Sequence, residues 1–228
     1  MKNQIDLKTF VSKTVHELSN PLAILLGRLQ LLSLESSSSE EVAMVKTLAS
    51  MQKATQRIFD ITRELKEVAI LEDCRSPMSS HELAKFVILA CDHIASKPEI
   101  NFMLNLGEEI TFLGDKKQLV RAIQNLISNA AEATESMSSR WIYLRIFKSH
   151  ESLRIEVSDN GPKIETELAE KCFTPFFSTK KKTGASGMGL TLTQLIVNQH
   201  DGLVFVDPNM DQTTFVITLP LETCKAAA

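Results

Sequence analysis

A short segment near the start of the chain, His16-Glu17-Leu18-Ser19-Asn20-Pro21-Leu22, combines side chains that can do chemistry together. His16, Glu17 and Asn20 fall within about one helical turn, and Asn20 lies beside His16 because residues four apart share a face. An imidazole nitrogen can act as a nucleophile, and an adjacent carboxylate can orient it or accept its second proton. The asparagine at position 20 excludes the two-histidine zinc motif of metalloproteases.

A pair of asparagines, Asn125 and Asn129, lies in a later segment with helical spacing. The two side chains share one helix face, and neutral amide oxygens can ligate Mg²⁺ when the phosphates of a nucleotide supply the charge. Hydrogen bonding between helices, or exposure to solvent, is the commoner explanation of such a pair taken alone. The pair therefore indicates a nucleotide site only together with other motifs.

The tripeptide Asp159-Asn160-Gly161 directly follows an expected strand. A carboxylate at a strand end can accept a hydrogen bond from an adenine amine, and a glycine lets a ligand approach the backbone. An ordinary Asx turn is the alternative. The motif is thus a candidate site for a nucleotide base.

A third and a fourth motif follow. The segment from Phe173 to Lys180 begins with three phenylalanines and turns polar, which predicts an apolar hinge beneath a lid whose lysines lie near phosphates. The glycine-rich stretch that ends in Gly187-Met188-Gly189-Leu190 opens an expected helix, where backbone N–H groups can face an anion. For the Phe173 segment the alternative is the edge of a hydrophobic core followed by solvated charges. For the glycine-rich stretch the alternative is a flexible loop.

Two long helices are expected to carry the His16 segment, because apolar residues alternate at spacings of four and three. The seam residues are Val11, Val15, Leu18, Leu22, Leu25, Leu29 and Leu32, and then Met44, Leu48, Met51, Thr55, Ile58, Thr62, Leu65 and Ala69. A serine run at 36–39 predicts the turn of an antiparallel hairpin. Two hairpins would close into a dimeric four-helix bundle; a monomeric hairpin packed on the rest of the chain is the alternative. His16 follows a seam residue and so faces the bundle flank, and Pro21 favours a bend.

The heptads stop near residue 75, where we place a domain boundary. Periodicity beyond it predicts helices and strands in alternation, which indicates an α/β sandwich with a mixed sheet. The helices are expected at 80–94, 115–137 and 190–199, and the strands at 99–106, 110–113, 141–147, 153–157, 203–206 and 214–219.

Composition narrows the class of protein. The 228 residues are 43% hydrophobic and 23% charged, as in soluble globular proteins, and the net charge of -3 gives no basic field for nucleic acid. Four cysteines without paired spacing predict free thiols in a reducing compartment. No apolar run is long enough for a membrane span, so we expect a cytoplasmic chain, with any sensory or membrane region outside it. Residues 225–228 resemble a cloning remnant.

Taken in order, these motifs resemble the catalytic core of bacterial-type two-component sensor histidine kinases. Their residues are most similar to those of the nitrogen-regulation-like subgroup. The resemblance implies a dimerisation and histidine-phosphotransfer hairpin at 1–75. It also implies an ATP-binding domain of the gyrase, MutL and histidine kinase type at 76–224. The implied activity is ATP-dependent autophosphorylation and transfer to an aspartate of a response regulator, with phosphatase activity toward that regulator.

The same resemblance assigns roles to residues. His16 would be phosphorylated, Glu17 would orient or deprotonate it, and Asn20 would position water for dephosphorylation of the partner. Mg²⁺ would bind Asn129, with ATP supported by the remaining residues of the four motifs. These cofactor-binding residues are Asn125, Asn129, Asp159, Gly161, Lys180, Gly187, Gly189 and Leu190.

Three positions depart from the family pattern: Glu132 stands where many members have a lysine, Lys163 where a second glycine is common, and Asp201 where His-Gly-Gly is usual. Lys163 places a side chain in the loop expected below the nucleotide. One alternative is therefore a phosphotransfer hub or pseudokinase with impaired ATP use. Another is a dimeric ATPase switch without phosphohistidine.

Overall fold

The computed structural model describes residues 7–34, 41–69, 74–177 and 187–221. By its contacts the chain divides into two compact units, one made of residues 1–70 with 175–188 and the other of residues 71–174 with 189–228. Each unit is described separately below.

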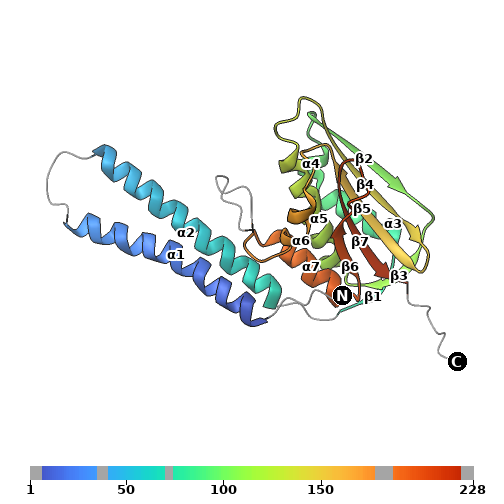
Figure 1. Cartoon of the computed structure of the whole chain (residues 1–228), viewed down its shortest axis with the longest axis horizontal. Helices are drawn as coiled ribbons and strands as arrows, with labels where there is room; N and C mark the ends of the chain where they lie inside the picture. The colour runs from blue at the N-terminus through green and yellow to red at the C-terminus, as the bar shows by residue number, and fades with distance from the viewer. Residues whose placement is uncertain (1–6, 35–40, 70–73, 178–186, 222–228) are drawn as a thin grey trace. The chain divides into compact units, whose positions relative to one another are not determined.

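The first unit is a helical hairpin in which α1 (Leu7–Leu34) and α2 (Glu41–Ala69) lie side by side, as Figure 1 shows. Helix α1 continues through Pro21 although proline lacks the N–H of the helical ladder. Two residues before Pro21, the Ser19 hydroxyl donates to the Val15 carbonyl at 2.7 Å, an arrangement that often accompanies bending.

The buried positions of the hairpin differ from the predicted seam by one residue. Thr14 and Pro21 are buried in α1, and Ala54 and Ile61 are buried in α2, each pair at heptad spacing. On α1 the seam residues that directly follow Thr14 and Pro21, and the next one at heptad spacing, remain exposed. Their exposed fractions are 58% for Val15, 47% for Leu22 and 52% for Leu29. The hairpin therefore has an inner contact stripe and, beside it, an apolar stripe that the single chain leaves open.

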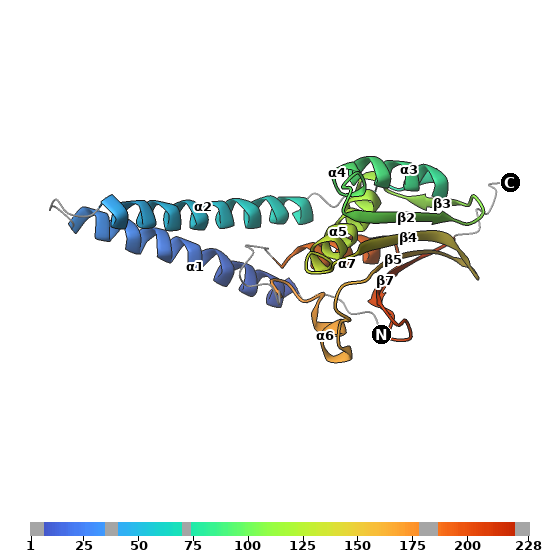
Figure 2. The same cartoon turned by 90° about the horizontal axis from the view of Figure 1, so that it is seen from above.

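The second unit is built on a five-stranded sheet with strand order β2-β4-β5-β7-β6. Its strands are β2 (Ile100–Leu106), β4 (Arg140–Ser149), β5 (Ser152–Asp159), β7 (Thr213–Pro220) and β6 (Leu203–Val206). Strands β2 and β4 pair in parallel and the other pairs are antiparallel, which confirms the predicted mixed sheet. Helices α3 (Ser80–Ala90), α5 (Lys116–Ala133) and α7 (Gly189–Gln199) pack on one face (Figure 2).

Some short elements were not predicted from the sequence. Strand β1 (Ser76–Ser79) pairs with β3 (Thr111–Gly114) just beyond the position predicted for the domain boundary, and α6 (Thr166–Lys171) is an additional helix. The helix expected at 80–94 is interrupted at Cys91, after which α4 (Asp92–Ala95) begins. A strand or helix of so few residues has too little periodicity to stand out.

The core lies between the sheet and the three helices. Alternate residues of β5, Leu153, Ile155 and Val157, are fully buried, and the apolar stripe of α5 faces them. Phe173 meets Phe215 of β7 edge to face, with ring centroids 6.2 Å apart. This packing gives α5 and α7 fixed positions on the sheet.

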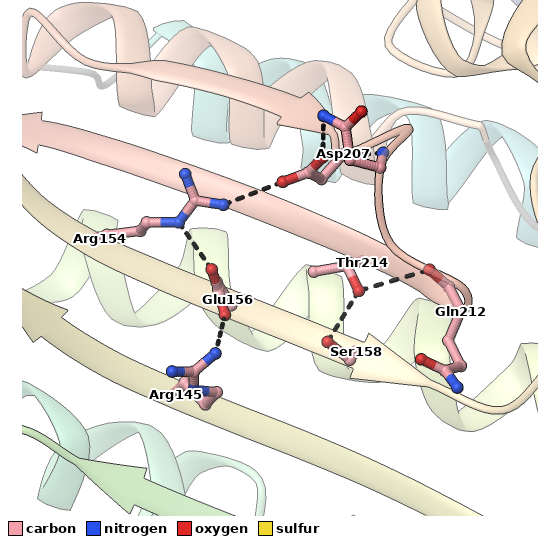
Figure 3. Close-up of polar contacts among 8 residues, drawn as sticks. Arg145, Arg154, Glu156, Ser158, Asp207, Gln212 and Thr214 are labelled. Carbon is pink, nitrogen blue, oxygen red and sulfur yellow. Dashed lines mark hydrogen bonds and ion pairs between the residues drawn. The ribbon is translucent and has the colours of Figure 1, made fainter. Parts of the chain in front are cut away.

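An ion-pair ladder crosses the other face of the sheet (Figure 3). Glu156 of β5, only 3% exposed, binds Arg145 of β4 at 2.9 Å and Arg154 at 2.6 Å. Arg154 also binds Asp207 at 3.0 Å. Partial burial opposes the charge of Arg154, but hydrogen bonds and attraction from the two carboxylates outweigh this and raise its pKa. The buried Glu156 carboxylate is thus fully paired, as such a charge must be.

The described cysteines are free thiols, in agreement with the sequence prediction; Cys224, like residues 225–228, lies outside the described residues. Burial raises the pKa of Cys91 to about 11 and that of Cys172 to about 12, so both remain protonated at neutral pH. Among the described helices, none has the length and apolar character that crossing a membrane requires.

Candidate active site

Helix α5 organises the candidate site of the second unit. Its first turn is fixed by the side chain of Asp115 and by a contact with the end of α7. The Asp115 side chain caps the helix by accepting from the Gln118 N–H at 3.1 Å. The Asp115 N–H donates to Nε2 of the buried His200 at 2.9 Å, so Nδ1 carries the imidazole proton and donates to the Ile196 carbonyl at 2.8 Å. A neutral histidine therefore joins the start of α5 to the end of α7.

Asn125 connects the middle of α5 to the start of α7. Its amide nitrogen donates to the Gly189 carbonyl at 3.0 Å and lies 3.4 Å from the Thr193 hydroxyl, which also binds that carbonyl at 3.0 Å. The asparagine pair and the second glycine motif are thus brought together. Because α7 begins at Gly189, its first N–H groups, including that of the half-buried Leu190, lack intrahelical partners and can face an anion.

Asn129 lies one turn beyond Asn125 on the same face of α5, and its side chain is partly exposed. It can offer one neutral amide oxygen to a cation. In the described part of the chain, no group of three histidine, cysteine, aspartate or glutamate side chains could hold a metal ion alone. A neutral amide oxygen such as that of Asn129 fits an Mg²⁺ ion that arrives with nucleotide phosphates.

The Asp159-Asn160-Gly161 motif meets the end of α5. Asp159 is the last residue of β5, is 1% exposed and accepts from the Gly161 N–H at 2.8 Å through Oδ1. This contact is the Asx turn that the sequence left as an alternative, and the carboxylate is buried as well. A Cβ atom on Gly161 would lie 2.7 Å from the Ala133 carbonyl oxygen, so glycine is required here for packing on α5.

The third motif is divided between the two units. Phe173 belongs to the second unit, where its carbonyl accepts from the Thr191 hydroxyl of α7 at 3.0 Å. Phe176 and Gly187 belong to the first unit and both have positive φ, 61° and 75°. A Cβ on Gly187 would lie 2.7 Å from the Phe176 carbonyl carbon, so no side chain fits at this glycine. Lys180 lies outside the described residues.

The hairpin presents the His16 segment on the surface of α1. His16 and Asn20 are exposed, so a large substrate can reach both. Glu17 is partly buried, and its Oε2 lies 3.4 Å from Nη2 of Arg57 on α2. The carboxylate predicted to serve His16 is therefore also in contact with a guanidinium.

Two residues at these sites were not singled out from the sequence. Arg57 contacts Glu17 across the hairpin, and the predicted antiparallel pairing of the helices was the signal that could have found it. Thr213 pairs with Asp159 across β5 and β7, and its hydroxyl lies 3.2 Å from the Pro162 carbonyl. No local sequence signal indicates that pairing, since it depends on strand order.

Comparison with protein families gives two matches. Residues 6–73 match the model of the His Kinase A (phospho-acceptor) domain. Residues 114–223 match the model described as histidine kinase-, DNA gyrase B- and HSP90-like ATPase. The matches fall on the hairpin and on most of the second unit, respectively.

Similar curated proteins include the sensory histidine kinase/phosphatase NtrB of Vibrio alginolyticus, with 28% identity over 94% of this chain and 62% of NtrB. The probable sensor histidine kinase TcrY of Mycobacterium tuberculosis is 28% identical over 95% of this chain and 46% of TcrY. This chain thus spans less than two thirds of either relative.

Solved structures show the same fold. The catalytic domain of histidine kinase ThkA aligns with a TM-score of 0.57 and 27% identity, covering 64% of this chain and 95% of that one. ThkA in complex with the response regulator protein TrrA aligns with a TM-score of 0.67 and 21% identity, covering 93% of this chain and 61% of that one.

Proposed function

We propose that this chain, a catalytic core of the sensor histidine kinase family, phosphorylates His16 with ATP and passes the phosphoryl group to a response regulator. The observation that carries the proposal is the pairing of an exposed histidine on a phosphoacceptor hairpin with nucleotide motifs that converge on α5. A candidate donor site and a candidate acceptor site thus lie in one chain.

The contacts of the second unit support the following roles in nucleotide binding. Asp159 accepts from the adenine amine, the open N-terminus of α7 receives phosphate oxygens, and Asn125 holds that N-terminus against α5. Asn129 would hold Mg²⁺, which when bound neutralises charge on the phosphates. The sequence further predicts that Lys180 and Gly187 would bind phosphate; Lys180 lies outside the described residues.

The phosphoryl transfer is a displacement at the γ-phosphorus. One ring nitrogen of His16 supplies an electron pair to phosphorus, the bond to the bridging oxygen breaks, and ADP leaves with that pair. The proton on the other ring nitrogen either passes to Glu17 or stays on the ring, with Glu17 holding the tautomer. Because the attacking and leaving groups must be in line, most of the catalysis is positioning.

The downstream partner is an aspartate of a response-regulator receiver domain. Two likenesses support this: ThkA was solved with a response regulator protein, and NtrB is named as both kinase and phosphatase. Asn20, exposed one turn after His16, would position the water that removes the phosphoryl group from the regulator. The exposed apolar stripe of the hairpin supports a homodimer, with a second copy completing a four-helix bundle.

The test is incubation with γ-radiolabelled ATP and Mg²⁺, comparing the unmodified chain with His16→Gln. The matched control is His93→Gln, which removes an exposed histidine from the second unit. We expect acid-labile label on the unmodified chain and the control, and none on His16→Gln. Undiminished acid-labile label on His16→Gln would contradict the proposal. Absence of Mg²⁺-dependent ATP binding would favour a phosphotransfer hub, and ATP turnover without label would favour an ATPase switch.

A further inference from the structure

The loop at residues 159–164, named the base loop here, is fixed on one side by Asn160. Its Oδ1 accepts from the Trp141 N–H at 2.9 Å and its Nδ2 donates to the Ser139 carbonyl at 2.6 Å. Between these two partners lies Arg140, whose guanidinium donates to the Ala131 carbonyl of α5 at 2.7 Å. This side of the base loop is therefore linked to the helix of the asparagine pair.

The other side of the base loop is fixed to the connection between β6 and β7. The Lys163 ammonium donates to the Met210 carbonyl at 2.7 Å. The Thr213 hydroxyl binds the residues on either side of Lys163. It accepts from the Ile164 N–H and donates to the Pro162 carbonyl, each at 3.2 Å. The Lys163 side chain is thus held at the β6–β7 connection, whereas Gly161 packs on α5.

Lys163 occupies its position without backbone strain. The described non-glycine residues with positive φ are His150, Phe176 and Asp201. Lys163 is absent from this group, so its backbone does not need glycine although a second glycine was expected there. The side chain that the sequence places in the loop expected below the nucleotide makes a contact that spans 47 residues of sequence.

We propose that Lys163 is a positioning residue that holds the base loop, and with it Asp159, at the spacing required for the adenine base. The inference rests on the proposed nucleotide site and adds a residue to it. Lys163 acts through the loop backbone and makes no contact with phosphate. Loss of the Lys163 ammonium should therefore weaken the binding of ATP and the binding of ADP by the same factor, since both carry the same base.

The experiment is calorimetric titration of the full chain with Mg²⁺–ATP and with Mg²⁺–ADP. The variants are Lys163→Met, which keeps the length and removes the donor, and Lys163→Arg, which keeps a cationic donor. Lys148→Met is the control, because Lys148 is also an exposed lysine of this unit. Thermal melting followed by circular dichroism checks that every variant is folded.

We expect Lys163→Met to raise both dissociation constants about three- to fivefold, in keeping with one partly solvated charged hydrogen bond. Lys163→Arg should restore most of the affinity, and Lys148→Met should match the unmodified chain. Unchanged affinity in Lys163→Met would overturn the inference, and so would a loss confined to ATP, which would indicate contact with the γ-phosphate. If the unmodified chain bound neither nucleotide, the proposed function itself would fail.

Discussion

The hairpin and the second unit place their candidate functional residues in opposite ways. On the hairpin, His16 and Asn20 are exposed, and Glu17 has one long contact with Arg57. In the second unit, Asp159 is 1% exposed and the Asn125 amide holds the start of α7. Chemistry on the hairpin is thus separable from its folding, whereas the nucleotide residues also hold their own domain together.

The two units also differ in how much of their apolar surface they bury. The second unit buries its apolar residues between the sheet and three helices, as a complete domain does. The hairpin leaves the stripe of Val15, Leu22 and Leu29 open. We therefore expect the first unit to depend on association, and the second to depend mainly on its own packing.

The largest effect is expected from charges on the open stripe, in the double substitution Leu22→Glu with Leu29→Glu. Burying carboxylates in a helical interface is costly, so the dimer dissociation constant should rise at least about 100-fold. Sedimentation analysis at micromolar concentration measures it. Leu203→Glu, at a 52% exposed leucine of the second unit, should leave the dimer intact. A double variant that remains dimeric would contradict the proposed role of the stripe.

The two glycine motifs give the next largest contrast. Gly161→Ala places a Cβ 2.7 Å from the Ala133 carbonyl oxygen and should lower the free energy of unfolding by about 1–3 kcal/mol. Gly189→Ala brings its Cβ no nearer than 3.8 Å, to Asn125, so stability should change by less than about 0.5 kcal/mol. Urea unfolding measures both. Equal losses would show that the packing of Gly161 does not explain its requirement.

A smaller loss of stability is expected from Asn125→Ala. It removes the hydrogen bond to the Gly189 carbonyl, so the free energy of unfolding should fall by about 1–1.5 kcal/mol, with weaker ATP binding. Thermal unfolding with and without Mg²⁺–ATP separates the two effects. Asn198→Ala is the control, since Asn198 is an exposed asparagine of α7. A variant as stable as the unmodified chain would remove the structural role assigned to this amide.

The smallest effect on stability is expected from Asn20→Ala, because the side chain is exposed. The free energy of unfolding should change by less than about 0.5 kcal/mol, and autophosphorylation should stay within about twofold. Removal of phosphate from a response regulator should slow by about 10-fold or more, since the water loses its positioning group. A phosphorylated regulator incubated with each chain provides the measurement. Unimpaired dephosphorylation would reject the role of Asn20.

Residues with local periodicity or spacing were predictable. The long helices, the mixed sheet and the asparagine pair all follow from patterns a few residues apart. The inner stripe of the hairpin was not found, since Thr14 and Pro21 are not residues that heptad patterns select. The partner of Lys163 could not be predicted either, because the Met210 carbonyl reaches it only through the order of the strands. Sequence spacing thus identifies groups on one element, and topology decides what meets across elements.

The ladder on the outer face of the sheet has a consequence for how this sequence can change over generations. Glu156 lies between Arg145 and Arg154, and Arg154 in turn binds Asp207. Replacing the carboxylate alone would leave two cations side by side, and replacing either arginine would leave a buried anion half compensated. Mutations at these positions should therefore become fixed in compensating pairs, so that descendants of this chain either keep the alternating charges or exchange them together for uncharged residues.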